Sequence, residues 1–204
     1  MTLHNDTIKG YKVFDTGLKC RDYDFIGVGS THTYEGEPVL CESGFHFCTT
    51  LQDCFRYYSI TSDMIICEVQ AIGYTDAKED CSKRTCKSLT ITRQMSFDEV
   101  IPHITDSQYA YLWTKNIGNA DIMIDRITNS EYAYRWAYNI GNKDIMINRI
   151  TDSQYAYTWA RNIGNKDIMI DRITNSEYAY LWTIYMGNKD IMIARFPELA
   201  KRLA

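Results

Sequence analysis

Hydrophobic and polar positions recur in a fixed order over the second half of the chain. From Ile104 onwards, one 23-residue pattern occurs four times without insertion or deletion. A period of this length is typical of helical repeat arrays, in which each unit buries its apolar face against its neighbours. The copies read ITDSQYAYLWTKNIGNADIMIDR from Ile104, ITNSEYAYRWAYNIGNKDIMINR from Ile127, ITDSQYAYTWARNIGNKDIMIDR from Ile150 and ITNSEYAYLWTIYMGNKDIMIAR from Ile173.

Each copy predicts two helices. The first opens with a capping-box pattern, Thr105 with Gln108 in the first copy, although Asp106 is an alternative N-cap one residue later. This helix ends after about three turns at Gly118, because glycine suits the left-handed residue that follows a helix. Asn119 then favours the start of a second helix of about two turns, too short to be stable without packing on its neighbours.

The apolar positions of the two helices predict one continuous buried face. In the first copy they are Tyr109, Ala110, Trp113 and Ile117, continued by Ile122, Met123 and Ile127. Trp113, Trp136, Trp159 and Trp182 are all the tryptophans of the protein, and we expect them to stack in the core of the array. The alternative is a ladder of indole rings that binds a ligand.

Eight positions on the first helices differ between the copies and lie three residues apart, so they share a face. We interpret them as a partner-binding surface, the alternative being neutral change at solvated positions. These positions are Leu112, Lys115, Arg135, Tyr138, Thr158, Arg161, Leu181 and Ile184.

The first 103 residues have a different pattern, of short alternating strands rather than helices. The predicted strands are Ile8–Asp15, Thr31–Tyr34, Phe45–Cys48, Met64–Gly73 and Ser88–Gln94, with a helix over Leu51–Tyr58. Ser96 with Glu99 forms a second capping box and opens a short helix. The sequence therefore predicts an α+β protein with three parts, a mostly antiparallel domain over 1–103, the repeats over 104–195 and a capping helix over 196–204.

Composition and charge narrow the function classes. Hydrophobic residues make up 45% and charged residues 24%, as in folded soluble proteins. Residues 1–103 carry ten basic against fifteen acidic side chains, and residues 104–204 carry twelve against eleven. Neither part is the basic surface that nucleic-acid binding requires, so nucleic acid is not expected as a partner. Without an apolar span or a signal-like N-terminus, we expect no membrane association and a cytoplasmic location.

The seven cysteines all lie before residue 87, and their spacing lacks the Cys-x2-Cys pairs of zinc sites. We expect reduced thiols and neither a metal nor a cofactor.

Two segments of the first domain resemble a known group of proteins. Tyr11-Lys12-Val13-Phe14 and Leu40-Cys41-x-x-Gly44-Phe45-His46-Phe47-Cys48, followed by a strand with Glu68, resemble an uncharacterised domain of phage and bacterial proteins. The repeats resemble the Glu-Tyr-Ala-Tyr repeats of similar phage-borne proteins. This resemblance implies a module of the host-cell cytoplasm that blocks a bacterial antiviral defence protein by direct contact.

A second likeness is to the ADP-ribosyltransferase fold, in which a Gly-aromatic-x-aromatic-Thr strand feeds a helix, as Gly44 to Tyr58 does here. The resemblance implies an NAD-using site, and its candidates would be Tyr11 or Lys12, His46, and Glu68 or Glu99. From the residues themselves, His46 alternates with two phenylalanines and faces either solvent or a cleft, whereas a carboxylate within an apolar strand such as Glu68 is usually salt-bridged. We expect His32 and His103 at the surface.

The leading expectation is a non-enzymatic protein that binds another macromolecule, namely a protein, through the repeats. An NAD-using transferase, or a protein that sequesters a nucleotide, both acting through the first domain, are the alternatives. The pattern leaves the oligomeric state open.

Overall fold

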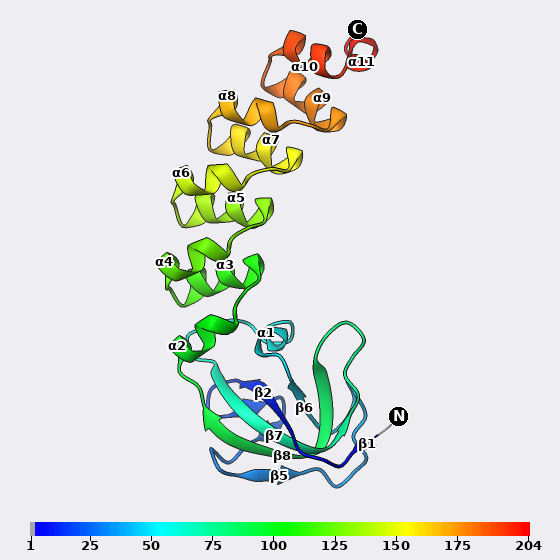
Figure 1. Cartoon of the computed structure of the whole chain (residues 1–204), viewed down its shortest axis with the longest axis vertical. Coiled ribbons are helices and arrows are strands. Elements are labelled where there is room, and N and C mark those ends of the chain that lie inside the picture. Colours follow the sequence, from blue (N-terminus) through cyan, green and yellow to red (C-terminus); the bar gives the residue numbers. More distant parts are fainter. Residues whose placement is uncertain (1–2) are drawn as a thin grey trace. The chain divides into compact units, whose positions relative to one another are not determined.

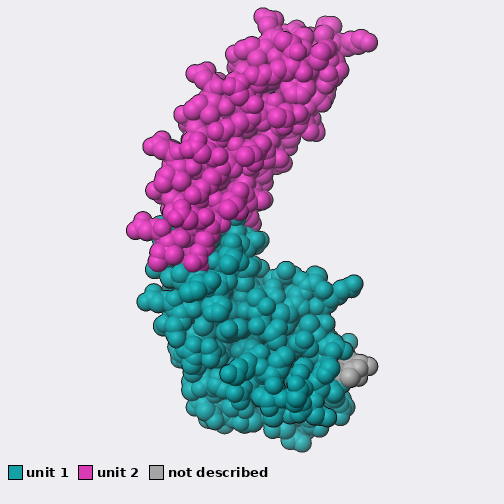
Figure 2. All heavy atoms as spheres, viewed as in Figure 1, with its two compact units in different colours: residues 1–120 teal, residues 121–204 magenta. Residues whose placement is uncertain are grey.

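The computed structural model describes residues 3–204 and divides the chain into two compact units, residues 1–120 and 121–204 (Figure 2). The first unit holds an antiparallel sheet with three helices, and the second holds short helices only, so the predicted α+β class with a helical array is confirmed. Among residues 3–204, no helix is both long enough and apolar enough to span a membrane.

The strands of the first unit are short at the beginning of the chain and long in the middle (Figure 1). They are β1 Leu3–His4, β2 Ile8–Phe14, β3 Lys19–Cys20, β4 Tyr23–Asp24, β5 Thr31–Thr33, β6 Phe45–Cys48, β7 Ile65–Thr75 and β8 Lys83–Gln94. The predicted strand at 45–48 has the observed bounds. β8 is longer than predicted because it pairs with three partners, β5, β6 and β7, along its length.

Six of these strands form one sheet in the order β1-β7-β2-β6-β8-β5, and all its pairings are antiparallel. An additional pairing of β7 with β8 joins β7, β2, β6 and β8 into a closed ring. The shortest ladder of the ring joins β2 and β6, which share a single registered pair, Tyr11 with Cys48. β5 lies at an edge, as its polar and apolar alternation predicts.

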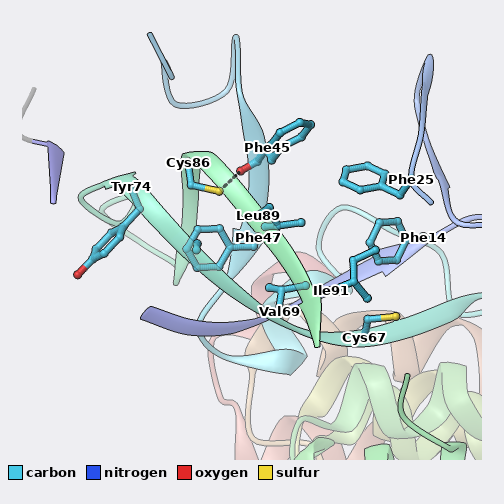
Figure 3. Close-up of a cluster of buried hydrophobic side chains, with 11 residues drawn as sticks. Phe14, Phe25, Phe45, Phe47, Cys67, Val69, Tyr74, Cys86, Leu89 and Ile91 are labelled. Carbon is cyan, nitrogen blue, oxygen red and sulfur yellow. Dashed lines mark hydrogen bonds between the residues drawn. The ribbon is translucent and has the colours of Figure 1, made fainter. Parts of the chain in front are cut away.

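The core inside the sheet is aromatic and aliphatic. Figure 3 shows Phe14 beside Phe25 and Phe47 beside Leu89, and these side chains are buried in one cluster with Phe45 and Ile91. The Cys86 thiol donates to the Phe45 carbonyl at 3.3 Å, so even the sulfur within this core has a polar partner. The inner face of the sheet therefore provides the hydrophobic burial that stabilises the unit.

The three helices of the first unit are α1 Leu51–Cys54, α2 Phe97–Val100 and α3 Ser107–Asn116, with a 3-10 helix over Ile101–His103. α1 is shorter than the predicted Leu51–Tyr58, and the chain continues in turns from Phe55, whose ring packs against the Trp113 ring at 6.4 Å. The capping box that opens α2 is present, with Ser96 accepting from the Glu99 amide.

α3, the first helix of the first repeat, packs on the sheet domain. The Gln52 side-chain oxygen of α1 accepts from the backbone amides of Thr105 and Asp106, at 2.7 and 3.0 Å. The Phe97 ring of α2 meets the edge of Trp113 at 5.3 Å. These contacts place residues 104–120 in the first compact unit. The sequence pattern instead predicts the boundary at 103, directly before the first repeat begins.

The array repeats a long helix, a short helix and a single 3-10 turn, except that the fourth copy fuses the last two. The remaining helices are α4 Ala120–Met123, α5 Ser130–Asn139, α6 Lys143–Met146, α7 Ser153–Asn162, α8 Lys166–Met169, α9 Ser176–Tyr185, α10 Lys189–Arg195 and α11 Leu199–Arg202, with 3-10 helices Ile124–Arg126, Ile147–Arg149 and Ile170–Arg172. α11 lies within the predicted capping segment and buries Leu199.

The long helices are capped by the later of the two predicted residues. Asp106, Asn129, Asp152 and Asn175 are the N-caps, each accepting from the amide two residues ahead. The threonine before each cap is not the N-cap, and in the third and fourth copies its amide serves the joint between repeats. The Ser130 hydroxyl accepts from the Thr151 amide at 2.8 Å, and Ser153 accepts from Thr174 at 2.9 Å.

An arginine at the end of each later repeat strengthens the same joint. Arg149 donates to the carbonyl of Ile124 in the preceding copy and, at 2.8 Å, to that of Ile127, the first residue of its own copy. Arg172 makes the equivalent bonds one repeat further on, and Arg195 reaches the Ile170 carbonyl at 2.7 Å. The Arg149 guanidinium spans the carbonyl of Ile124, the first residue of a 3-10 helix, and that of Ile127, which follows this helix, so the joint is held by charge-assisted hydrogen bonds.

The turn inside each repeat differs from the prediction at its asparagine. Asn119, Asn142, Asn165 and Asn188 take left-handed backbone angles, with φ between 54° and 61°, and the glycine before each also has a positive φ. The asparagine side chain therefore does not cap the second helix. In the first two copies its oxygen accepts instead from the indole N–H of a buried tryptophan, at 3.4 Å.

Candidate functional site

The eight variable positions of the array lie half-exposed or exposed, as a contact surface requires. Lys115, Tyr138, Arg161 and Ile184 are all exposed, Tyr138 with 60% of its area accessible. Of the other four variable positions, Arg135 is exposed and pairs with Glu131 at 2.7 Å, whereas Leu112, Thr158 and Leu181 are half-buried. Their role in partner binding stays a prediction.

The predicted core of the repeats is only partly correct. All four tryptophans are fully buried, together with Met123, Met146, Met169 and Met192, which confirms that they belong to the core. The isoleucine before each methionine is not buried. Ile122, Ile145, Ile168 and Ile191 keep 49, 45, 46 and 43% of their area accessible.

These four isoleucines form what we call the isoleucine row. The apolar spacing assigned the first of them, Ile122, to the buried face together with Met123 and Ile127. Adjacent residues on a helix point about 100° apart, however, so Ile122 and Met123 do not both face a narrow core. The structure buries the methionine and exposes the isoleucine in every copy.

The sheet unit contains a cleft of about 910 Å³. It is lined by residues 11–13 of β2, by residues 44–48 around β6, and by the segments 20–23 and 57–59. β2 and β6 share only the pair of Tyr11 with Cys48, and the cleft lies beside this short ladder. The walls carry many aromatic rings, among them Tyr23, Tyr34 and Tyr57.

Lys12 is the buried charge of this cleft, with 2% of its area accessible. Its ammonium donates to the His46 carbonyl of β6 at 2.8 Å, bridging the strands where the ladder stops. It also lies 5.3 Å and 5.4 Å from the ring centroids of Phe14 and Phe25. No salt bridge to a carboxylate is found for Lys12 within residues 3–204.

His46 lines the same cleft, on the opposite side of its strand from Phe45 and Phe47. Its Nε2 accepts from the Cys41 amide at 3.0 Å, which requires the neutral imidazole. Burial, followed by the charges of Lys83, Lys12 and Arg21, lowers the His46 pKa to about 4. The ring is therefore neutral near pH 7, with its acceptor nitrogen already occupied by the backbone.

The acidic candidates lie elsewhere. Glu68 of β7 faces Arg93 of β8 in register and pairs with it at 2.7 Å. Glu99 pairs with the same guanidinium at 2.6 Å and also accepts from the Ser96 amide. Of the ADP-ribosyltransferase-like set, the structure brings Tyr11 and His46 to the cleft and collects Glu68 and Glu99 around Arg93, outside the residues that line it.

The thiols of the cleft form a second polar group. Cys48 and Cys54 are buried side by side, and a hydrogen bond from Cys54 lowers the pKa of Cys48 while the pKa of Cys54 is raised. Cys20 contacts the Tyr58 hydroxyl at 3.0 Å. All seven cysteines are free, and among residues 3–204 no three His, Cys, Asp or Glu side chains gather as metal ligands would.

His32 differs from its predicted surface position. It is 4% accessible and packs edge-on against Phe25 at 4.7 Å, while Tyr23 and Ser30 hydrogen-bond to its two ring nitrogens. Burial lowers its pKa. A sequence with one histidine on a short edge strand gives no sign of the aromatic cluster that encloses it, because the partners come from distant segments.

Comparison with curated proteins and with solved structures gives no match for this chain. Comparison with family models gives one, over residues 8–103. These residues, which include the closed sheet and the cleft, match the family described as Domain of unknown function (DUF7666).

Proposed function

We propose that this chain is a non-enzymatic binding protein whose helical array contacts another protein. The observation that carries the proposal is the isoleucine row, one half-exposed apolar side chain in every repeat. An apolar row rimmed by polar residues is typical of protein contact surfaces rather than of solvated helices. Exposed Asp144 and Lys143 beside Ile145 illustrate this polar rim.

The basic residues of the array support a protein partner over nucleic acid. The arginines at the joints donate to the carbonyls of Ile124, Ile147 and Ile170 in the preceding copies, so their guanidinium groups are already engaged. Residues 104–204 carry nearly equal numbers of acidic and basic side chains. Such a surface lacks the continuous positive charge that follows a phosphate backbone.

A bacterial antiviral defence protein is the partner that we propose, and this narrower part rests on the resemblance to phage-borne proteins. A transferase activity has less support, because Glu68 and Glu99 are engaged with Arg93 and lie outside the cleft residues.

The test is capture of a partner by the full-length chain from bacterial lysate, repeated with the double variant Ile145→Asp/Ile168→Asp. The charged side chains place two carboxylates within the row, so we expect at least a tenfold loss of the captured protein. The control is Asn148→Asp, which adds one charge to the same array at a position where a sibling repeat already carries Asp125. The purified partner must then bind the wild type and Asn148→Asp more tightly than it binds the double variant.

Equal capture by the wild type and the double variant would remove the isoleucine row from the contact. Capture that depends on Tyr138 and Arg161 instead would move the surface to the variable positions. Absence of any stoichiometric partner would contradict the proposal as a whole.

A further inference from the structure

The cleft of the sheet unit suggests a second site, independent of the array. We propose that it binds a small phosphate ester that also carries a planar ring and hydroxyl groups, the chemistry of a nucleoside monophosphate. The argument rests on the charge at the floor of the cleft, the rings of its walls, the carboxylates at its rim and its volume.

The buried ammonium group of Lys12, at the floor of the cleft, favours an anionic ligand. Moving an ammonium group out of water is costly unless a charge of opposite sign accompanies it. Lys12 is buried and has a carbonyl, a thiol and two ring faces around its ammonium, but no carboxylate partner within residues 3–204. A phosphate oxygen at this place would supply the missing charge through a charge-assisted hydrogen bond.

A second cation reinforces the same preference. Lys83 lines the cleft half-buried, with its ammonium 4.1 Å from the Tyr57 ring centroid and without a salt bridge in the described chain. Arg21, also a lining residue, is exposed. The charges inside the cleft are thus positive, whereas the three lining carboxylates, Asp15, Asp22 and Glu42, are exposed and belong to its rim.

The rest of the ligand is deduced from the walls and the size. A free phosphate ion would leave most of about 910 Å³ unfilled, since cavities of this size accommodate whole organic ligands. Tyr23, Tyr34 and Tyr57 offer ring faces for a planar base, and exposed carboxylates accept hydrogen bonds from sugar hydroxyls. Phosphate, ring and hydroxyls are the three groups that a nucleotide combines.

The experiment uses the full-length protein and four probes, namely AMP, adenosine, ribose 5-phosphate and inorganic phosphate. Binding is measured by thermal shift and by titration calorimetry. AMP should raise Tm, since a ligand that binds only the folded state stabilises it. Adenosine, ribose 5-phosphate and phosphate should each bind at least tenfold more weakly. Equal binding of phosphate and AMP would overturn the ligand class, as would failure of AMP to bind at millimolar concentration.

The residue test compares two lysines of the same strand. Lys12→Met should lower the affinity for AMP about 10- to 100-fold, the worth of a hydrogen bond to a charged group. Lys9→Met changes an exposed lysine outside the cleft and should leave the affinity unchanged. Because methionine replaces a buried charge that lacks a carboxylate partner, Lys12→Met should still fold.

Unaltered AMP affinity in Lys12→Met would contradict the proposed site. Should Lys12→Met not fold, Lys83→Met provides the measurement, with a loss of about tenfold expected and no loss as the contrary result. A negative result for the isoleucine row would leave this outcome unaffected, because neither Ile145 nor Ile168 lines the cleft.

Discussion

The two units of the chain solve the problem of stability in opposite ways. In the array, one kind of joint is used repeatedly: a serine hydroxyl accepts from an amide of the next repeat, and an arginine donates to a carbonyl of the previous one. In the sheet unit, by contrast, most contacts occur once. Lys12, His46 and His32 each have surroundings that no other residue shares.

This difference decides where evidence for function lies. In a repeat, an apolar side chain that is exposed in every copy is recognised by comparing the copies with one another. In the sheet unit no internal comparison exists, and a site is found only when the fold brings distant strands together. Repetition therefore reveals a surface, whereas a closed sheet conceals a cleft until its strands are paired.

The largest effect is expected from the tryptophan core. Trp159→Ala should lower the free energy of unfolding of the array by about 3–5 kcal/mol, because a large buried ring leaves a cavity. Trp136→Ala should cost the same within about 1 kcal/mol if the joints are equivalent. Denaturant unfolding followed by fluorescence of the remaining tryptophans reports on the repeats, since the strands contain none.

Ile168→Ala in the same repeat is the control, and its cost should stay below about 1 kcal/mol because the side chain is already half-exposed. A difference of several kcal/mol between Trp136→Ala and Trp159→Ala would break the equivalence on which the comparison rests.

A smaller effect is expected from the joint itself. Arg172→Met removes the hydrogen bonds to the Ile147 and Ile150 carbonyls and should cost about 1–3 kcal/mol. Arg161→Met, on an exposed arginine of the same repeat, should change stability by less than about 0.5 kcal/mol. Both values come from denaturant titration of tryptophan fluorescence, and equal costs would show that the arginine ladder does not hold the repeats.

The smallest effect is a pH dependence of the free energy of unfolding that arises in the sheet unit and not in the array. The His46 pKa of about 4 lies below its ordinary 6.5, so the unfolded chain takes up this proton first as the pH falls. Stability should therefore decrease from about pH 6.5 down to about pH 4 and then level off. After allowance for partial exposure of the ring, the loss is about 1–2 kcal/mol.

The measurement compares wild type with His46→Gln by denaturant unfolding monitored by far-UV circular dichroism at several pH values. The variant should lack this part of the pH dependence, and the array, which contains no histidine beyond residue 103, should not contribute to it. Parallel pH profiles for the two proteins would mean that His46 titrates normally.

The periodic pattern predicted the repeats, their two helices and the burial of the tryptophans, because helix packing in an array depends on residues close in sequence. It did not predict the exposure of Ile122, since the apolar side chains of both helices were taken to form one continuous buried face. The left-handed turn at Asn119 was missed for a related reason: asparagine suits both a cap and a left-handed residue, and only the backbone decides.

The cleft was predictable only in part. Strand alternation correctly placed His46 opposite to Phe45 and Phe47, but the pairing of Glu68 with Arg93 depends on a register that local sequence does not contain. The same holds for Lys12, which was considered only as an alternative to Tyr11. Its burial follows from closure of the sheet, which joins strands far apart in the chain.

Gln52 joins the sheet domain to the first repeat. Its side-chain oxygen receives the amides of Thr105 and Asp106, just as Ser130 receives those of Thr151 and Asp152. The sheet domain thus accepts the same pair of amides from the first copy that one copy accepts from the next. Unequal crossing-over between near-identical gene segments would add or delete whole copies without creating a new kind of junction. The number of isoleucines in the isoleucine row is therefore free to change, while the domain that carries the cleft stays as it is.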